Sequence, residues 1–306
     1  MNGTDCITIR QKDGYITKLT YLSCNNKPKA SVLILHGMAE HHNRYLSFAQ
    51  FLVDSGFDVY LYDHRGHGTD KKLSDLGFFA YNKGYQLVID DAVEVSKYIE
   101  RHNRSNKFIL FAHSMGSLIA RNVIQSYDKY DGVILSGTAY PSNFLILSGL
   151  FITSVIKNTK GPKYISPFIN NLLFGSKKYT VLSDRTVYDW LSRSHQVVGA
   201  YIHDPYCGFT CTASFYYDLM KLTANAANKK LMRQTKHDLP MFIISGEKDP
   251  VGGYAKDIKR LLSVYKKLGF TNISYKIYPE CRHELINELN KEEVYNDIRY
   301  WILKKI

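Results

Sequence analysis

The chain of 306 residues lacks long apolar runs, a leader-like N-terminus and a regular set of cysteines. No stretch reaches the roughly 20 apolar residues that a membrane-spanning helix needs, so we expect no membrane span. The first residues contain no basic segment followed by an apolar core, and we therefore expect no signal peptide. The five cysteines are odd in number and lack the spacing of a disulfide framework, which favours a reducing compartment such as the cytoplasm.

Motifs for metal ions and nucleic acids are also missing. Cys207 and Cys211 have a spacing that suits a metal ion, but no second pair of ligands follows them, which favours free thiols. The 40 Lys and Arg residues exceed the 28 Asp and Glu residues by 12, and such a charge favours anionic partners. Because the basic residues are scattered, we interpret them as a solvated surface, or as one with weak peripheral attraction to anionic membranes. We infer no nucleic-acid partner, and no protein partner can be inferred.

Short apolar runs alternate with helical patterns along most of the chain. The runs are typical of buried strands, and they lie at residues 30–35, 58–62, 108–111, 132–135, 241–244 and 273–278. Apolar residues at helical spacing predict helices at residues 45–55, 85–101, 214–222, 254–268 and 292–303. A hairpin around Asp13-Gly14 precedes them. This alternation predicts an α/β fold, with a mainly parallel sheet flanked by helices.

The alternation stops between residues 140 and 212. This stretch has several short helical patterns and an apolar segment at residues 144–156, which is too short to cross a membrane. Its prolines are Pro141, Pro162, Pro167 and Pro205. We predict a single domain of residues 1–306, in which residues 140–212 are inserted as a mostly helical cap over the carboxyl edge of the sheet.

A sharp turn links a predicted strand to a predicted helix within residues 107–126. Its residues 112–116 have the arrangement of a nucleophile elbow, in which a strained turn holds a serine at the sheet edge with its Oγ exposed. Small residues two places before and after the serine let the strand and the helix approach each other. Gly116 fits the usual pattern, and Ala112 departs from it with the next smallest side chain. The turn predicts that Ser114 is a nucleophile.

A nucleophilic serine requires a base that accepts its proton and an acid that orients the base. In such a fold the chain order is serine, acid and then histidine. Asp249 directly follows a predicted strand, and His283 is the one histidine after it in the sequence. Both positions lie at the carboxyl edge of a parallel sheet, where open α/β sheets place their sites. We therefore predict a catalytic triad of Ser114, His283 and Asp249.

Acyl transfer also needs two backbone N–H groups that bind the negative oxygen of the tetrahedral intermediate. One is expected from Met115, which follows the nucleophile. The second is expected from Met38, in the loop after the strand at residues 30–35, because Gly37 can turn that amide inward. These two residues are the predicted oxyanion hole.

Several motifs in these loops resemble those of monoacylglycerol lipases and bacterial lysophospholipases. The resemblance rests on His36-Gly37-Met38-Ala39-Glu40-His41 with Arg44-Tyr45, Asp63-His64-Arg65-Gly66-His67-Gly68, Ala112–Gly116, Asp204-Pro205, Gly246 with Asp249-Pro250, and Arg282-His283-Glu284. It spans about residues 32–289 and implies an α/β-hydrolase fold. It also implies the same triad and the same oxyanion hole. We expect Glu40 either to order the oxyanion loop or to contact a polar head group.

The sequence therefore predicts a serine hydrolase of carboxylic esters of lipids, of the monoacylglycerol lipase or lysophospholipase type, with no metal or organic cofactor. The apolar cap predicts an acyl-chain groove, for which the candidate residues are Phe144, Leu147, Phe151 and Leu172. Two alternatives stay open on the same fold, a small-ester carboxylesterase and an aminopeptidase. A catalytically silent binding protein is a third alternative, which the intact Ser-Asp-His set disfavours.

Overall fold

The computed structural model describes residues 4–182 and 185–305. Within them the chain forms one eight-stranded sheet in the order β1-β2-β4-β3-β5-β6-β7-β8. The strands are β1 (Thr4–Arg10), β2 (Ile16–Leu22), β3 (Ser31–Leu35), β4 (Asp58–Tyr62), β5 (Phe108–His113), β6 (Gly132–Ser136), β7 (Met241–Gly246) and β8 (Ile273–Tyr278). Strands β1 and β2 form an antiparallel hairpin, and β2 pairs with β4 in the antiparallel sense. The remaining neighbours, from β4 through β3, β5, β6 and β7 to β8, are parallel. The predicted, mainly parallel sheet is confirmed.

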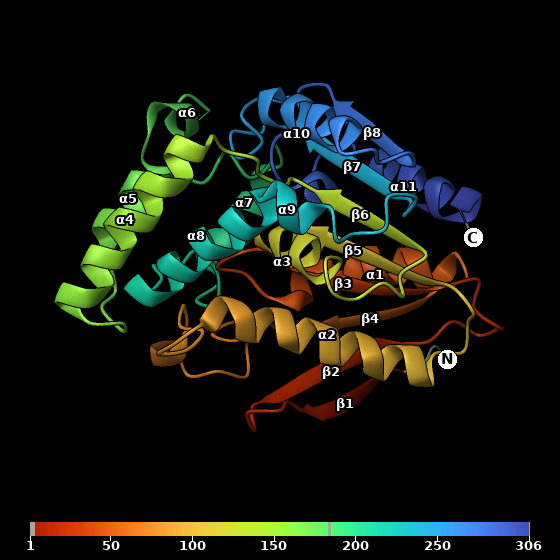
Figure 1. The fold of residues 1–306 in the computed structure, drawn as a ribbon. Helices are drawn as coiled ribbons and strands as arrows, with labels where there is room; N and C mark the ends of the chain where they lie inside the picture. Colours follow the sequence, from red (N-terminus) through yellow and green to blue (C-terminus); the bar gives the residue numbers. More distant parts are fainter. Residues whose placement is uncertain (1–3, 183–184, 306) are drawn as a thin grey trace.

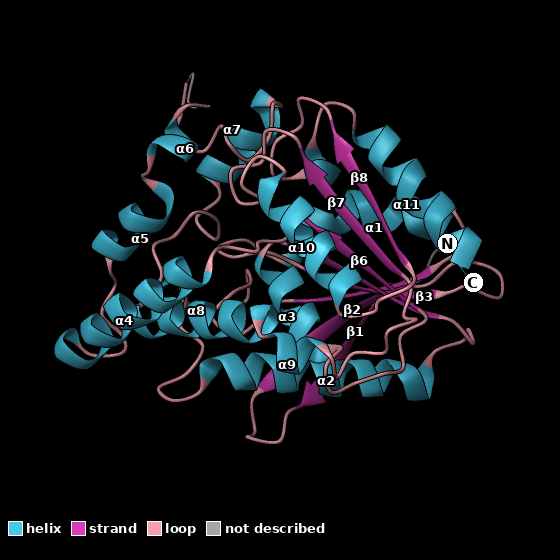
Figure 2. Ribbon diagram, turned by 45° about the horizontal axis from the view of Figure 1, so that its top comes forward, coloured by secondary structure: helices cyan, strands magenta, loops and turns pink. Residues whose placement is uncertain are grey.

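Helices cover both faces of this sheet (Figure 2). They are α1 (Leu46–Asp54), α2 (Gly84–His102), α3 (Met115–Val123), α4 (Asn143–Lys160), α5 (Pro167–Phe174), α6 (Lys177–Thr180), α7 (His195–His203), α8 (Ala213–Ala227), α9 (Lys229–Met232), α10 (Lys256–Lys267) and α11 (Lys291–Lys305). Three short 3-10 helices lie at His42–Tyr45, Leu73–Asp75 and Leu285–Asn287. Side chains of α1 and α11 pack into the core on one face, and those of α2, α3, α8 and α10 pack into the core on the other.

The central strands are buried on both faces, which explains why they are continuous apolar runs rather than alternating ones. Successive side chains still point to opposite faces. Leu33 and Leu35 of β3 enter the core beside α2 and α3, whereas Val32 and Ile34 enter the core beside α1 and α11. The strands are thus fixed in register, and their carboxyl ends meet at one edge.

Helices α4 to α7 and their connections make up residues 140–212 of the sequence, and we call this stretch the cap segment. Figure 1 shows α4 and α5 at one end of the molecule, on the opposite side from α11. Helix α4 packs on α8, and a Cβ built at Gly149 would lie 2.6 Å from Met220 Sδ, so the two helices approach closely there. None of the helices in the described part of the chain combines the length and apolar character needed to span a bilayer.

Candidate active site

Ser114 lies between β5 and α3 in a backbone conformation that residues other than glycine rarely adopt, with φ 51° and ψ −117°. This strained turn is the one that the elbow motif predicts. A Cβ built at Gly116 would lie 2.5 Å from the carbonyl oxygen of Leu35, so only glycine lets α3 begin this close to β3. Ala112 is fully buried in β5, where its small side chain faces the core next to α3.

The structure brings the three predicted catalytic side chains together at the carboxyl edge of the sheet. The Oγ of Ser114 lies 2.9 Å from Nε2 of His283, although 169 positions separate the two residues. The Nδ1 of the same imidazole lies 3.0 Å from Oδ1 of Asp249. The three residues follow β5, β8 and β7, and parallel pairing of neighbouring strands places those strand ends side by side.

The charge of Asp249 favours one tautomer of His283. Burial acts to raise the pKa of Asp249, but the adjacent His283 lowers it below its ordinary value. Burial likewise acts to lower the pKa of His283, and the charge and hydrogen bond of Asp249 raise it overall. An ionised carboxylate only accepts, so the Nδ1–H of His283 donates to Asp249. Its Nε2 then carries the lone pair that accepts the Ser114 hydroxyl proton.

A second histidine, His113, lies beside the first but stays neutral. Its ring centre is 4.6 Å from that of His283. Burial, reinforced by the positive charge of His283, lowers the pKa of His113 to about 3. His113 therefore supplies packing at this edge and is not positioned as the base. A Cβ built at Gly137 would lie 2.9 Å from Cε1 of His283, so the absence of a side chain at Gly137 leaves room for the imidazole.

The loop that contains Met38 lies against the nucleophile. A Cβ built at Gly37 would lie 3.2 Å from the Cβ of Ser114, which places the Gly37–Met38 peptide next to the elbow. Met115 opens α3, so its amide is among those not used inside the helix. Both residues therefore lie next to Ser114, and their role as oxyanion donors stays a prediction.

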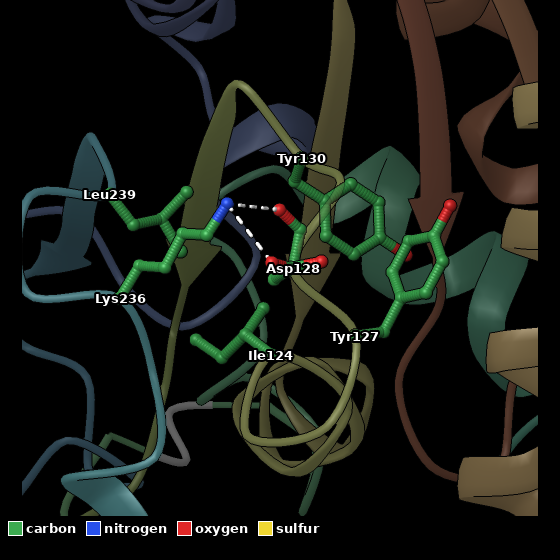
Figure 3. Close-up of a pocket in the computed structure, with 6 residues that line it drawn as sticks. All are labelled: Ile124, Tyr127, Asp128, Tyr130, Lys236 and Leu239. Atoms are coloured by element: carbon green, nitrogen blue, oxygen red, sulfur yellow. Dashed lines mark hydrogen bonds and ion pairs between the residues drawn. The ribbon is translucent and has the colours of Figure 1, made fainter.

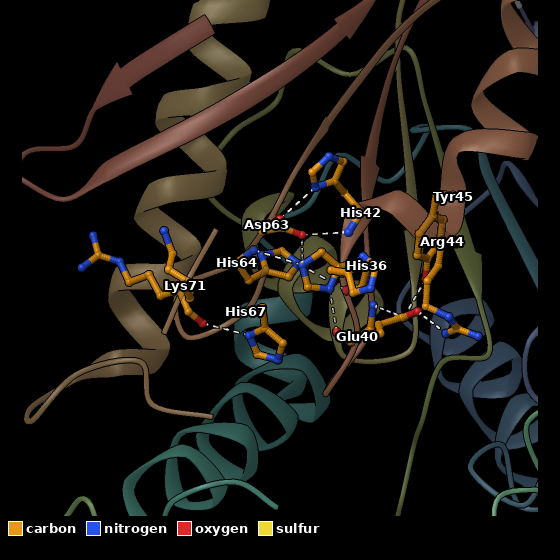
Figure 4. Close-up of polar contacts among 12 residues, drawn as sticks. His36, Glu40, His42, Arg44, Tyr45, Asp63, His64, His67 and Lys71 are labelled. Carbon is orange, nitrogen blue, oxygen red and sulfur yellow. Dashed lines mark hydrogen bonds and ion pairs between the residues drawn. The ribbon is translucent and has the colours of Figure 1, made fainter. Parts of the chain in front are cut away.

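Neutral histidines hold this oxyanion loop from one side (Figure 4). The N–H of Ala39 donates to Nε2 of His67 at 3.1 Å, and the N–H of His64 donates to Nε2 of His36 at 3.0 Å. A ring nitrogen can accept only when it is unprotonated. Burial matches this requirement, because it lowers the pKa of His36 well below its ordinary value and that of His67 to about 4.

Sequence reasoning missed the contact between the cap segment and the loop of His283. The N–H of His283 donates to the carbonyl oxygen of Trp190, and the N–H of Glu284 donates to that of Leu191 at 2.7 Å. The indole of Trp190 also lies 5.3 Å from the imidazole of His283, between centres. Nothing in the local sequence at residues 189–193 signals this role, since the partners lie more than 90 positions away.

The candidate acyl-groove residues are all exposed. The exposed fractions of their side chains on α4 and α5 are 78% for Phe144, 66% for Leu147, 71% for Phe151 and 50% for Leu172. The helical spacing of the first three residues gathers them on the outer side of α4, whereas Ile146 and Thr153 are its buried side. Their contact with substrate stays a prediction.

Three side chains in the described part of the chain have atoms spaced for a metal ion, namely His41, Asp204 and Cys207, whose ligand atoms lie within 4.8 Å of one another. The Nε2 of His41 already bonds Oδ2 of Asp204 at 2.8 Å, and burial raises the pKa of the Cys207 thiol. A protonated thiol is a poor metal ligand. The geometry is explained by a polar contact between the oxyanion loop and the cap segment.

Two surface hollows lie away from the serine. The one drawn in Figure 3 is lined by Tyr127, Asp128 and Lys236 among others, near the amino ends of β6 and β7 and thus at the sheet edge opposite Ser114. The other has a volume of about 270 Å³ and lies between the 3-10 helix Leu73–Asp75 and the cap segment. Neither has any of the three predicted catalytic residues in its lining.

Known proteins share both the sequence pattern and the fold. The family model described as Serine aminopeptidase, S33 matches residues 26–290. A monoacylglycerol lipase of Mycolicibacterium smegmatis is 25% identical over 91% of this chain and 90% of that protein. A human monoglyceride lipase is 23% identical over 91% of this chain and 86% of its own length.

Among solved structures, a thermostable carboxyl esterase of Bacillus coagulans superposes with a TM-score of 0.90 and 24% identity, over 100% of this chain and 99% of that one. The α/β-hydrolase fold and the resemblance to monoacylglycerol lipases are thereby confirmed. The chain therefore belongs to the serine aminopeptidase, S33 family, as a monoacylglycerol lipase-like hydrolase.

Proposed function

We propose that this protein hydrolyses carboxylic esters of lipids, with a monoacylglycerol or a lysophospholipid as substrate. The observation that carries the proposal is the continuous contact from Ser114 through His283 to Asp249 at the strand ends. The names of its relatives, a monoacylglycerol lipase and a phospholipase among them, supply the substrate class.

In the proposed reaction the Oγ of Ser114 attacks the ester carbonyl carbon while Nε2 of His283 takes its proton. Asp249 holds the imidazole in the required tautomer and stabilises the imidazolium that forms. The same imidazolium then gives the proton to the leaving alcohol, and an acyl-enzyme remains. Water attacks the acyl-enzyme with His283 again as base, which releases the fatty acid and restores Ser114.

The charge that develops on the carbonyl oxygen needs fixed donors. The backbone amides of Met38 and Met115 supply them in this proposal, and each such donor accounts for roughly 10²- to 10³-fold in kcat in enzymes of this chemistry. The strained turn at Ser114 supports this role for Met115, because a nucleophile elbow exposes the serine Oγ beside the amide of the next residue.

The exposed apolar face of α4 supports a lipid substrate and weak, peripheral contact with an anionic membrane. Phe144, Leu147 and Phe151 are each at least 66% exposed. Large apolar side chains rarely gather on one solvent-exposed helix face unless that face binds something. Lys157 and Lys160 close the same helix with positive charge. We also propose a cytoplasmic location, because all five cysteines are free thiols.

The test is a panel of monoacylglycerols, lysophospholipids, p-nitrophenyl esters from acetate to myristate, and aminoacyl amides, assayed with wild type and Ser114→Ala. We expect glycerol or phospholipid esters to be cleaved by wild type alone, with rates that depend on acyl length. A flat chain-length profile favours a small-ester carboxylesterase, and turnover of aminoacyl amides favours a peptidase. Failure of Ser114 to react with a fluorophosphonate contradicts any hydrolytic function.

A further inference from the structure

The carboxylate of Glu40 lies at the centre of the oxyanion loop. Its Oε1 accepts the N–H of Gly37 at 2.6 Å and the hydroxyl of Tyr45 at 2.8 Å. Its Oε2 accepts Nη1 of Arg44 at 2.6 Å. Because Gly37 directly precedes Met38, Glu40 holds the peptide next to the one from which the second oxyanion donor is expected. Of the two roles predicted for Glu40, these contacts favour loop ordering.

Arg44 continues this contact to the other side of the site. Its Nη1 and Nη2 bond the two oxygens of Glu284 at 2.7 and 2.6 Å, in a parallel, bidentate pair. Glu284 directly follows His283 and is 240 positions from Arg44. One guanidinium therefore joins the loop of the expected oxyanion donor to the loop of the expected base.

The same guanidinium contacts the cap segment. Its centre lies 4.8 Å from the ring of Tyr201 in α7, and the hydroxyl of that tyrosine donates to the carbonyl oxygen of Ala39 at 3.1 Å. Arg44 thus meets three separate parts of the protein at one point. Figure 4 shows it beside Glu40 and Tyr45, on the other side of the oxyanion loop from His64 and His67.

This group of side chains is buried and carries a net negative charge. Glu40 and Glu284 are each 3% exposed, and the side chain of Arg44 is 11% exposed. Burial acts to raise the pKa of Glu284, but the charge of Arg44 lowers it to about 2. Burial raises the pKa of Glu40, while the N–H of Gly37, the Tyr45 hydroxyl and Arg44 all donate to its carboxylate and favour the ionised form. With both carboxylates ionised around one guanidinium, one negative charge remains close to His283, in a medium where charges interact strongly.

The groups that face His283 come from several elements. Asp249 follows β7, His113 ends β5, Ser114 begins the elbow, Glu284 is the next residue, and Glu40 lies in the oxyanion loop. Burial lowers the pKa of His283, and the charges of Asp249, Glu284 and Glu40 act together to raise it. His113 is neutral at ordinary pH and the Trp190 ring is uncharged, so the two glutamates are the additional charges.

We propose that Arg44 is a positioning residue, which joins Glu40 to Glu284 and thereby sets the oxyanion loop against the loop of His283. The net negative charge of the three residues also stabilises the imidazolium that forms when Ser114 loses its proton. This inference rests on the proposed function, since it concerns the same reaction. None of the three residues touches the reacting atoms, and each acts through a neighbour.

Two variants test it on p-nitrophenyl acetate, a short soluble ester. Arg44→Lys keeps the charge but cannot form the bidentate pair. We expect kcat to fall roughly 10- to 100-fold with KM little changed, because small misplacements of reacting groups have effects of this size. Glu284→Gln removes one charge near His283. We expect the acidic limb of the kcat/KM profile to move to lower pH. The reason is that the variant has less negative charge to stabilise the imidazolium, which lowers the pKa of His283.

Arg104→Lys is the matched control. Arg104 also forms a bidentate pair, with the buried Asp58 at 3.0 and 2.7 Å, but at the amino end of β4. It should lose stability without loss of kcat. Wild-type kcat in Arg44→Lys, or an unmoved acidic limb in Glu284→Gln, overturns the inference. If Arg44→Lys does not fold, the pH profile of Glu284→Gln decides alone. Wild type that hydrolyses no ester would refute the proposed function instead.

Discussion

The rim of the sheet and the outer face of α4 are built in opposite ways. At the rim, Ser114, His283 and Asp249 lie among buried charges and neutral imidazoles, and hydrogen bonds of 2.9 and 3.0 Å link them. On α4, large apolar side chains such as Phe144 and Phe151 are exposed. In the proposed function the geometry of the reacting groups is thus set inside the protein, whereas we propose that α4 offers contact area to a molecule outside it.

The cap segment contains both kinds of region. Its residues 189–193 bond the loop of His283 through four backbone carbonyl groups and the side chain of Arg193. Residues 143–160 meet the rest of the protein chiefly through the packing of α4 on α8. A change in the first part should therefore affect folding and every substrate. A change in the second part should affect only substrates that are long or membrane-bound.

The largest effect is expected at the rim, from Ser114→Ala. Loss of the nucleophile should lower kcat on the order of 10⁶-fold for short and long esters alike. Sedimentation with vesicles that contain anionic lipid should be unchanged, because α4 is untouched. Fluorophosphonate labelling of the variant checks that no other serine reacts. Residual turnover above about one hundredth of the wild-type rate would assign the nucleophile elsewhere.

The second effect separates the two parts of the cap segment. Arg193 bonds the fully buried Glu288 at 2.9 Å and also contacts Cys281 and Asn290. Arg193→Met removes the ion pair with that buried carboxylate, so we expect a loss of about 3–5 kcal/mol in the free energy of unfolding by urea.

The matched control for Arg193→Met is Lys157→Met on α4, which removes a contact with the Tyr217 ring and a charge interaction with Asp218. That change should stay within about 0.5 kcal/mol of wild type. Equal losses in the two variants would show that the cap segment is held uniformly.

Lowering the pH should affect the rim of the sheet and the outer face of α4 differently, because they differ in titratable groups. His64, His67 and His113 have pKa values of about 3, 4 and 3, well below the ordinary 6.5, because they are buried. Between pH 6.5 and about 4 the unfolded chain binds protons at these sites and the folded protein does not. The free energy of unfolding should therefore fall as the pH is lowered, by up to roughly 1.4 kcal/mol per pH unit for each histidine.

One histidine opposes this trend. The pKa of His283 is raised, so its contribution to stability is present below pH 6.5 and is lost as the pH rises through its folded value. Burial raises the pKa of Asp91 and that of Asp218 to about 6, so these two groups also add stability in acid. The three histidines with lowered pKa outweigh these groups, and urea melts at pH 7.5 and 5 should show lower stability in acid. Helix α4 contains no Asp, Glu or His, so vesicle binding by the folded protein should not change over this range. Equal stability at the two pH values would contradict the neutral imidazoles.

The smallest effect on folding is expected from the double variant Phe144→Ser and Phe151→Ser. Both side chains are exposed, so the urea midpoint should hardly move. Vesicle binding and turnover of long-chain monoacylglycerols should fall several-fold, while turnover of p-nitrophenyl acetate stays at the wild-type level. Tyr300→Ser on α11, 67% exposed, is the control for loss of an exposed aromatic group. A matching fall in this control would deny α4 a special role.

The sheet was predictable because its strands are short apolar runs between glycine-containing turns. The predictions of residues 58–62 and 273–278 agree with β4 and β8 in full. Other elements differ by a few residues at their ends, as for α2 and α10, and α8 extends five residues beyond its predicted end. The four-residue α9 was not predicted, since one helical turn is too short for a periodic pattern. The candidate triad could be predicted because the chain order of serine, acid and histidine leaves His283 as the single histidine after Asp249.

The rest depends on contacts between distant positions. The pairing of Arg44 with Glu284 and that of Trp190 with His283 join segments that no local pattern relates. The exposed side of α4 was also hidden, because its apolar residues run continuously from Phe144 to Leu147 and mask the helical period. A motif thus locates a reacting group, whereas the supports around it follow from the tertiary packing.

The chain has two tryptophans, and the structure places them in unlike surroundings. Trp301 is buried on α11 and stacks on Phe242, far from any proposed substrate contact. Trp190, half-buried, lies over the imidazole of His283. Ultraviolet emission of the unlabelled protein should therefore contain a steady component from one indole and a variable one from the other. Movement of the cap segment during turnover could then be followed optically, without any attached dye.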